Sequence, residues 1–441
     1  MNNSKADISN IYNLNGRVPL GKAVPFGLQH ILAMFVANIA PRIIVANACH
    51  QGSGETAQQI QTTKVIAGIG TLIQLFPIWK VGSGLPIVMG ISFTFVSVAC
   101  TVGAQYGYNA IVGAVIVGGF IEGTIGLFAK YWTKLITPIV SASVVTAIGF
   151  SLLSVGAASF GGGSGNDRFG SVQNWILGTV TLLSCLIFDM LAKSYWKQLS
   201  VLFGLIVGYI LAVFMGAVDF SALHDTAAVS LPSIMPFKPV FKASAIVSMT
   251  LIFLVSATET IGDTSALAIS GLNRPVTVKE TEGSIACDGY ASMLSGILGC
   301  LPVTSFSQNV GLIAMTKVVN RMVIGVGACI MILAGIFPFF GAVLATLPDA
   351  VLGGCTIMMF GSIVVSGIKM IAACGFEQRN ITIAALSLGI GIGFTQVPEI
   401  FSVFPPIIYT VFAENCVAVV FIVAIVANLI LPKDSEAAKG E

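Results

Sequence analysis

Leu301–Lys317, LPVTSFSQNVGLIAMTK, combines an apolar segment with a proline near its start and a polar centre. Gly299 and Gly311 flank that centre. The polar side chains of the stretch are Ser305, Ser307, Gln308, Asn309, Thr316 and Lys317. A hydrophobic helix interrupted by Pro and Gly, with polar groups at the interruption, is typical of a substrate site inside a membrane transporter. A re-entrant loop or a polar contact between helices is the alternative interpretation.

The composition of the whole chain indicates an integral membrane protein. Of its 441 residues, 56% are hydrophobic and only 9% are charged, and the mean hydropathy is +0.94. Soluble domains carry about 25% charged residues. The net charge of +2 provides no basic surface for nucleic acid. The nine cysteines are scattered without a CxxC pair, so we expect apolar fillers and no metal or other cofactor.

Fourteen apolar segments are long enough to cross or half-cross a bilayer. They are Pro25–Val45, Thr63–Trp79, Gly84–Thr101, Ala110–Phe128, Leu135–Phe160, Trp175–Leu191, Leu199–Val218, Ala243–Ile269, Gly283–Cys300, Leu301–Val318, Met322–Leu347, Ala350–Ala373, Thr382–Gln396 and Cys416–Leu431. With both termini in the cytoplasm, sixteen of the 21 Lys and Arg residues fall on the inner side. This asymmetry predicts a multi-pass protein of the cytoplasmic membrane in that orientation.

The two halves of the chain resemble each other. Seven segments precede the loop at 221–242 and seven follow it, so the second half enters the membrane with opposite polarity. The third segment of each half is interrupted: GSGLPIVMGISFTFV at Gly82–Val96 and GCLPVTSFSQNVGLI at Gly299–Ile313. Each is predicted to form a short β-strand followed by a half-helix. Alignment on the prolines places Ser92 and Phe93 opposite Gln308 and Asn309. The alternative is that any two segments rich in Gly and Pro look alike.

Carboxyl groups mark the eighth and ninth segments. Glu259 and Asp263 lie one helical turn apart on one face. An ionisable group in a span costs about 2.5–3.5 kcal/mol, and no Lys or Arg in the eighth segment neutralises the pair. We therefore expect this face to line a cavity, where a carboxylate can accept hydrogen bonds from ring N–H groups and can take up a proton. A buried structural carboxyl is the alternative for Asp263. Asp288 is expected to relay protons or to support the site.

Three further side chains have weaker assignments. His30 is the only His within a segment, and a packing role competes with proton transfer. Phe93 is expected to stack on a flat ring, although packing is the usual role of a Phe. Glu122 and Asp189 are interpreted as structural, with Asp189 paired to Lys193 one turn away.

Gln308-Asn309-Val310-Gly311, followed by Thr316-Lys317, resembles the signature of the nucleobase–ascorbate transporter family, also called the nucleobase–cation symporter-2 group. That signature reads Gln/Glu/Pro-Asn-x-Gly-x4-Thr-Arg/Lys/Gly. The resemblance covers the whole chain and extends to GLQH with His30, to ETIGD and to DG with Asp288.

The resemblance implies an all-α polytopic fold of fourteen segments in two inverted repeats of seven. Segments 1–4 and 8–11 would form a core domain, and segments 5–7 and 12–14 a gate domain. The implied division is an N-terminus at 1–24, core at 25–132 and 243–347, gate at 133–220 and 348–431, an inter-repeat loop at 221–242 and a C-terminus at 432–441. A homodimer through the gate domain, surrounded by lipid, is expected by resemblance only.

The resemblance also implies roles for the site. Glu259 and Gln308 would bind a purine ring, Phe93 would stack on it, and Ser92 and Ser307 would offer main-chain contacts. The residues that would shape the site or couple protons are His30, Asp263, Asp288, Asn309 and Gly311. Similar members with Gln at the first signature position are typically proton-driven xanthine or uric acid permeases. Val310 departs from the second Asn of many xanthine carriers.

These observations predict proton-coupled uptake of xanthine and/or uric acid by an elevator-like alternating-access mechanism. The first alternative is a symporter for uracil or another nucleobase. The second is an anion channel or exchanger on the same scaffold, which would need a basic or hydroxyl-rich site. An enzyme would need a nucleophile–base set or a metal cluster, and no such set occurs at working spacing, so none is expected.

Overall fold

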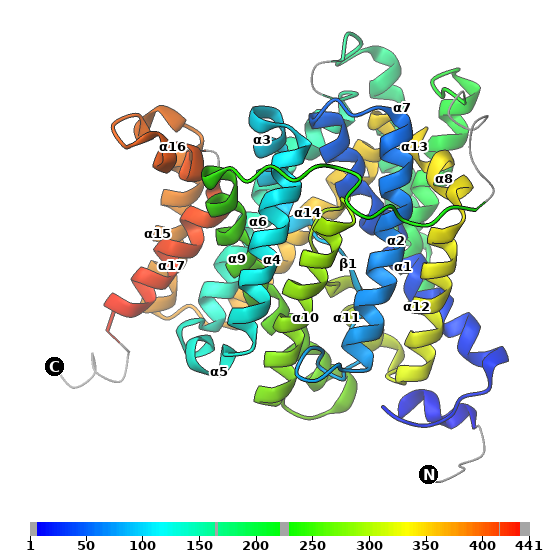
Figure 1. The fold of residues 1–441 in the computed structure, drawn as a ribbon, viewed down its shortest axis with the longest axis horizontal. Helices are drawn as coiled ribbons and strands as arrows, with labels where there is room; N and C mark the ends of the chain where they lie inside the picture. The colour runs from blue at the N-terminus through cyan, green and yellow to red at the C-terminus, as the bar shows by residue number, and fades with distance from the viewer. Residues whose placement is uncertain (1–6, 164–165, 221–228, 414, 433–441) are drawn as a thin grey trace.

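The computed structural model describes residues 7–163, 166–220, 229–413 and 415–432, and nearly all of its regular structure is helical (Figure 1). The helices are α1 (Leu20–Ala48), α2 (Ser53–Leu75), α3 (Val96–Tyr106), α4 (Tyr108–Gly126), α5 (Ala129–Trp132), α6 (Pro138–Phe160), α7 (Val172–Leu191), α8 (Ser200–Phe214), α9 (Ala243–Leu272), α10 (Val278–Ile297), α11 (Ser307–Thr316), α12 (Arg321–Ile336), α13 (Pro338–Ala345), α14 (Asp349–Ala373), α15 (Gln378–Thr395), α16 (Pro406–Phe412) and α17 (Cys416–Ile430). Two strands, β1 (Met89–Ile91) and β2 (Val303–Ser305), complete the fold.

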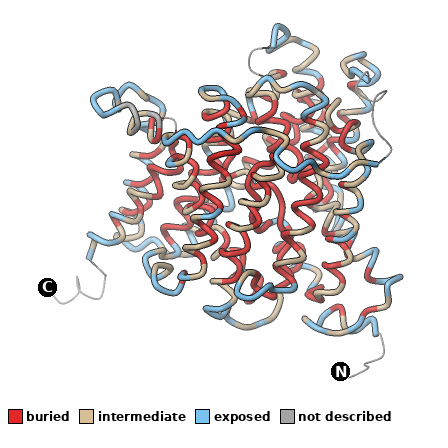
Figure 2. The backbone as a smooth tube through the Cα atoms, in the orientation of Figure 1, coloured by how far each residue is buried: buried red, intermediate tan, exposed pale blue. Residues whose placement is uncertain are grey.

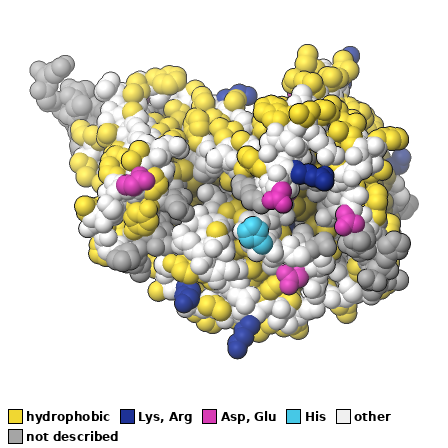
Figure 3. All heavy atoms as spheres, turned by 90° about the horizontal axis from the view of Figure 1, so that it is seen from above, with side chains coloured by type: hydrophobic (Ala, Val, Ile, Leu, Met, Phe, Trp, Pro, Cys, Tyr) yellow, Lys and Arg dark blue, Asp and Glu magenta, His cyan; other side chains and the backbone are white. Residues whose placement is uncertain are grey.

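The fold is that of a polytopic membrane protein. Within the described ranges, six helices are long and apolar enough to cross a bilayer: α1, α4, α6, α7, α9 and α14. Buried residues occupy the middle of the helix bundle, and exposed residues concentrate in the loops at its two ends (Figure 2). Seen from above, hydrophobic side chains form broad patches and charged side chains are sparse (Figure 3). The count of fourteen crossings and the inverted repeat stay predictions.

The eleventh predicted segment, Met322–Leu347, is not one continuous helix. It is divided into α12, which ends at Ile336, and α13, which begins at Pro338. Proline has no N–H to continue the hydrogen-bond ladder and disfavours helical backbone in the residue before it. Phe337 accordingly has an extended backbone, with φ −98° and ψ 100°.

β1 and β2 pair antiparallel at the centre of the molecule, with Met89 opposite Ser305 and Ile91 opposite Val303. Each strand leads into a short helix: β1 through the 3₁₀ turn η2 (Phe93–Phe95) into α3, and β2 into α11. The prediction of a strand plus a half-helix in the third and tenth segments is therefore confirmed. Extended backbone at membrane depth is stable only when protein surrounds it, and both strands are fully buried.

Side chains of neighbouring helices complete the hydrogen bonds of this two-stranded sheet. The N–H of Ile91 donates to Asn38 Oδ1 at 2.7 Å, that of Met89 to Thr71 Oγ1 at 2.9 Å, and that of Val303 to Ser292 Oγ at 3.0 Å. Because a buried N–H without a partner is strongly unfavourable, these contacts fix the strands against α1, α2 and α10.

The alignment on prolines is two residues out. β1 begins three residues after Pro86, whereas β2 begins one residue after Pro302. The strand starts therefore place Phe93 opposite Ser307, not opposite Asn309. The difference arises because Ile87 and Val88 extend the chain before β1 starts to pair.

Small residues bring the helices close together. α4 packs along α10, and a Cβ at Gly289 would lie 2.0 Å from the backbone N of Gly123. α14 packs along α6, and a Cβ at Gly353 would lie 2.0 Å from the backbone N of Phe160. In lipid, no hydrophobic effect drives helices together, so their association depends on such close backbone contact. The predicted core and gate division is compatible with these pairs but is not tested by them.

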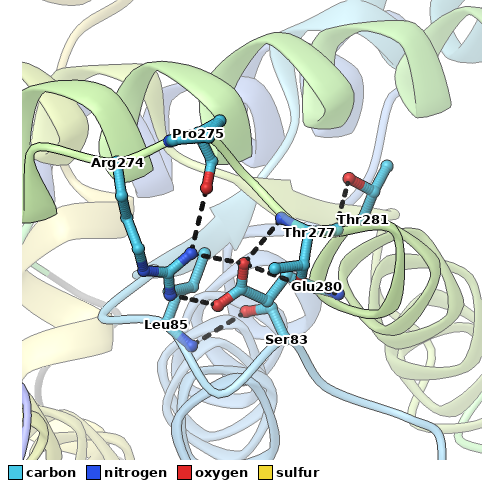
Figure 4. A network of polar contacts seen from close by, with 7 residues as sticks. All are labelled: Ser83, Leu85, Arg274, Pro275, Thr277, Glu280 and Thr281. Atoms are coloured by element: carbon cyan, nitrogen blue, oxygen red, sulfur yellow. Dashed lines mark hydrogen bonds and ion pairs between the residues drawn. The ribbon is translucent and has the colours of Figure 1, made fainter.

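The start of α10 is fixed by a polar network (Figure 4). Thr277 and Glu280 form a capping box, and the Arg274 guanidinium donates to both carboxyl oxygens of Glu280, at 2.9 Å for Nη1 to Oε2. Glu280 precedes Gly283, where the predicted membrane segment starts. Burial opposes its ionisation, but the hydrogen bonds from Arg274 and Thr277 outweigh burial and hold the pKa of Glu280 below its ordinary value.

The predicted pair between Asp189 and Lys193 is wrong. α7 ends at Leu191, and Ala192 and Lys193 have extended backbones, so Lys193 is not one helical turn beyond Asp189. The chain then turns back through the 3₁₀ segment η4 (Ser194–Leu199), and Lys197 Nζ lies 3.5 Å from Asp189 Oδ2.

Candidate functional site

A cavity of about 400 Å³ lies where η2, α9 and the β2–α11 junction face α6 and α14. Its volume falls within the range of about 300–1,000 Å³ that is usual for small-molecule sites. The predicted site residues that line it are Ser92, Phe93, Glu259, Asp263, Ser307 and Gln308. The structure thus brings together residues that are far apart in the sequence. Their roles in binding stay predictions.

Glu259 projects from α9 into the cavity. Thr94 Oγ1 of η2 donates a hydrogen bond to Glu259 Oε2 at 2.7 Å. The other carboxyl oxygen, Oε1, makes no hydrogen bond with any described residue, so it is available to a ligand. Thr94 also lines the cavity and was not predicted, although its place two residues after Ser92 in the same interrupted segment was a usable signal.

Asp263 lies one turn further along α9 and is anchored. Ser305 Oγ at the end of β2 donates to Asp263 Oδ2 at 2.8 Å. Asp263 therefore lines the cavity and also fixes β2 to α9, and its direct role in binding or proton transfer stays a prediction. A second carboxyl this close to Glu259 makes the site strongly acidic.

Asp288 lies behind the cavity wall and does not line it. Its Oδ2 accepts hydrogen bonds from Thr260 Oγ1 and, at 2.8 Å, from Thr304 Oγ1, and Gln74 Nε2 donates to its Oδ1 at 3.2 Å. One carboxyl thereby connects α2, α9, α10 and β2. This geometry supports the prediction of a supporting role for Asp288, while proton transfer through it stays a prediction.

His30 and Asn309 also lie outside the cavity and contact each other. Asn309 Nδ2 donates to the backbone oxygen of His30 at 3.0 Å and lies 3.2 Å from His30 Nδ1. Both side chains are buried, and together they attach α11 to α1. Gly311 is exposed on the next turn of α11, and it does not line the cavity either.

Ser307 and Gln308 form the first turn of α11, and both are exposed to the cavity. No side chain caps this helix, because the preceding residue is Phe306. The free N–H groups of an uncapped N-terminus carry partial positive charge and attract carbonyl or anionic oxygens. The Gln308 amide adds a donor and an acceptor at the same point.

Phe93 contacts α14 across the cavity. Its ring meets Phe360 edge to face, with centroids 5.3 Å apart and an interplanar angle of 82°. Because Phe93 also lines the cavity, a planar ligand can stack on it.

None of the described residues that line this cavity is Lys or Arg. The arrangement therefore favours a planar, hydrogen-bonding ligand whose N–H groups face the carboxyls and whose carbonyl oxygens face α11.

Glu122, which is predicted to be structural, does not line the cavity. Its side chain is fully buried in α4, and neither of its carboxyl oxygens has a hydrogen-bond partner among the described residues.

A family model described as "Permease family" matches residues 21–400. Among curated proteins, the chain is 34% identical to a "Xanthine permease" of Bacillus subtilis (strain 168), over 96% of both chains. It is 33% identical to "Xanthine permease XanQ" of Escherichia coli (strain K12), over 98% of this chain and 95% of that one. It is 36% identical to "Uric acid permease PucK" of Bacillus subtilis (strain 168), over 85% and 88%.

Two solved structures have a similar fold. The transmembrane domain of the cyanobacterial bicarbonate transporter BicA superposes with a TM-score of 0.58 at 14% identity, over 95% of this chain and all of that one. The murine anion transporter Slc26a9 in the inward-facing state gives a TM-score of 0.62 at 9% identity, over 94% and 70%. At these identities the likeness concerns the fold alone.

Proposed function

Because this chain belongs to the nucleobase–ascorbate transporter family, we propose that it carries a purine base, xanthine or uric acid, into the cell together with protons. One observation carries the proposal: a single cavity joins the carboxyl of Glu259, the amide of Gln308 and the ring of Phe93. This set suits an oxopurine, which presents ring N–H donors, carbonyl acceptors and a flat π-face.

Recognition would divide between the two sides of the cavity. The free Oε1 of Glu259 would accept a ring N–H, while Thr94 holds the other oxygen. The Gln308 amide and the N-terminus of α11 would donate to ring carbonyl oxygens. Stacking on Phe93 would add about 0.5–1.5 kcal/mol beyond the burial of area.

Proton coupling would arise from the carboxyls. Glu259 and Asp263 line the cavity and Asp288 lies behind it, with no Lys or Arg among the described lining residues. Removing ionised carboxylates from water without a counter-ion costs several kcal/mol each. Uptake of a proton together with the purine would remove that unfavourable charge as the cavity closes, and so link the two binding events.

Transport would require movement of the predicted core domain against the gate domain. The cavity lies between them: Glu259 and Gln308 belong to the core ranges, and Met359 and Ser366 of α14 to the gate ranges. It extends along α9 to Ala266 and along α14 to Met370, toward the ends of both helices. With both termini in the cytoplasm, as the asymmetry of Lys and Arg predicts, those ends would face the cytoplasm and this form would correspond to an inward-facing state.

Uptake of labelled xanthine into cells that overproduce the protein tests the proposal. Saturable uptake that an imposed proton gradient accelerates is expected, with competition by urate. Glu259→Gln, at equal amount in the membrane, is expected to abolish it. Competition by uracil alone would favour the alternative nucleobase substrate, and a passive ion conductance without purine uptake would favour the anion-channel alternative.

A further inference from the structure

A second cavity, of about 360 Å³, adjoins the first at the N-terminus of α11. The two cavities share Ser307, Gln308, Met359, Ile363 and Ser366. Gln308 thus borders two spaces of ligand size. The second space is bounded by α1, α8 and α14 and lies toward the end of the molecule where α7 ends and α8 begins.

The two cavities differ in charge. The first is lined by two carboxyls, whereas the described lining of the second holds one cation, Lys197, and one carboxyl, Asp189. These two form an ion pair of 3.5 Å, with 54% of the Lys197 side chain and 27% of the Asp189 side chain exposed. Pairs as exposed as this contribute little to stability, so a ligand can displace one partner from the other. Ser200 of α8 and Ser366 of α14 add hydroxyls to the same lining.

We propose that this second cavity is a subsite for purines that carry a negative charge, in which Lys197 exchanges its contact with Asp189 for the ionised ring. The inference rests on the proposed function. Oxopurines are N–H acids, and urate is a monoanion at neutral pH. Its charge is unfavourable beside Glu259 and Asp263, and the second cavity supplies the cation that the first lacks. The Gln308 amide, exposed to both cavities, gives the ring a polar contact as it passes between them.

Substitution of Lys197 and of Asp189, one at a time, distinguishes a lysine that binds the ligand from an ion pair that is purely structural. The full chain is reconstituted in liposomes, and the half-saturating concentration for urate exchange is measured. Lys197→Gln is expected to raise it about fivefold, because the ligand loses its counter-ion, while Asp189→Asn is expected to lower it, because the competitor is gone. A purely structural pair predicts the same direction for both variants.

Controls address charge and folding. Lys193→Gln removes a charge from the same connection outside both cavities, and it is expected to match the wild type. At acidic pH, where xanthine is neutral, the half-saturating concentration for xanthine exchange is expected to stay within twofold of the wild-type value in all variants. If Lys197→Gln does not elute as a folded protein, Asp189→Asn alone still decides the question.

Three results would overturn the inference. One is a change of the half-saturating urate concentration in the same direction in Lys197→Gln and Asp189→Asn. Another is an unchanged half-saturating urate concentration in Asp189→Asn. The third is wild-type exchange of xanthine without urate, which would leave the proposed function intact. Liposomes that exchange neither purine would overturn the proposed function as well.

Discussion

Thr94→Val removes one hydrogen bond at the centre of the proposed site and leaves the shape of the side chain nearly unchanged. Thr94 Oγ1 is the only hydrogen-bond donor to Glu259 among the described residues, at 2.7 Å. A hydrogen bond to a charged group contributes about 1.5–3 kcal/mol, which corresponds to about 10- to 150-fold in an equilibrium constant. Because the bond fixes the carboxyl that would face the purine, we expect the KM for xanthine to rise by about tenfold or more.

Labelled-xanthine uptake over a range of concentrations measures this effect, with the amount of protein in the membrane determined by immunoblot. Thr94→Ser keeps the hydroxyl and is expected to stay within about threefold of the wild-type KM, since only a methyl group is lost. A KM within twofold of wild type in Thr94→Val, at equal amounts of protein, would refute the reasoning that Thr94 orients Glu259.

Three further predictions concern stability. Asp288→Ala leaves the surrounding hydroxyls and amide without their shared acceptor and is expected to lower the free energy of unfolding by about 3 kcal/mol or more, seen as a lower melting temperature in detergent. An unchanged melting temperature would contradict this. Gly90→Ala places a Cβ 2.6 Å from Cε2 of the Phe306 ring and equally close to Met34 Cε, and is expected to destabilise by about 1–3 kcal/mol in the same assay, whereas an unchanged melting temperature would show that the strands can shift. The pKa of Glu280 is lowered in the folded protein, so its stabilising effect is present at neutral pH and is lost as pH falls below the ordinary pKa of a Glu carboxyl and through its lowered value in the folded protein. Glu280→Gln is therefore expected to lose less thermal stability than the wild type on acidification, and equal losses would count against the ion pair with Arg274.

Much of the site was predictable because interrupted apolar segments are rare. Proline and glycine beside polar residues identified both segments that contain the strands, and the spacing of Glu259 and Asp263 indicated a common face. Those features are local, so the sequence reports them directly. The same local pattern predicts that Gln308 lines a cavity.

The remaining features depend on contacts between distant segments. Thr94 matters because η2 lies against α9, and the hydroxyls around Asp288 matter because β2 lies between α9 and α10. The alignment of the two halves on their prolines differs from the alignment on their strands, because β1 and β2 begin at different distances from Pro86 and Pro302. Asp189 pairs with Lys197 because the chain leaves the helix and turns back. No sequence period or spacing predicts these contacts between distant segments, although the position of Thr94 two residues after Ser92 marks it as a candidate lining residue.

Electron cryomicroscopy of the protein with bound xanthine tests the central claim most directly. The account predicts density for the purine in the first cavity, within hydrogen-bond distance of the Glu259 carboxyl and the Gln308 amide and against the ring of Phe93. Density for xanthine outside this cavity, with Glu259 and Gln308 making no contact to it, would contradict the account.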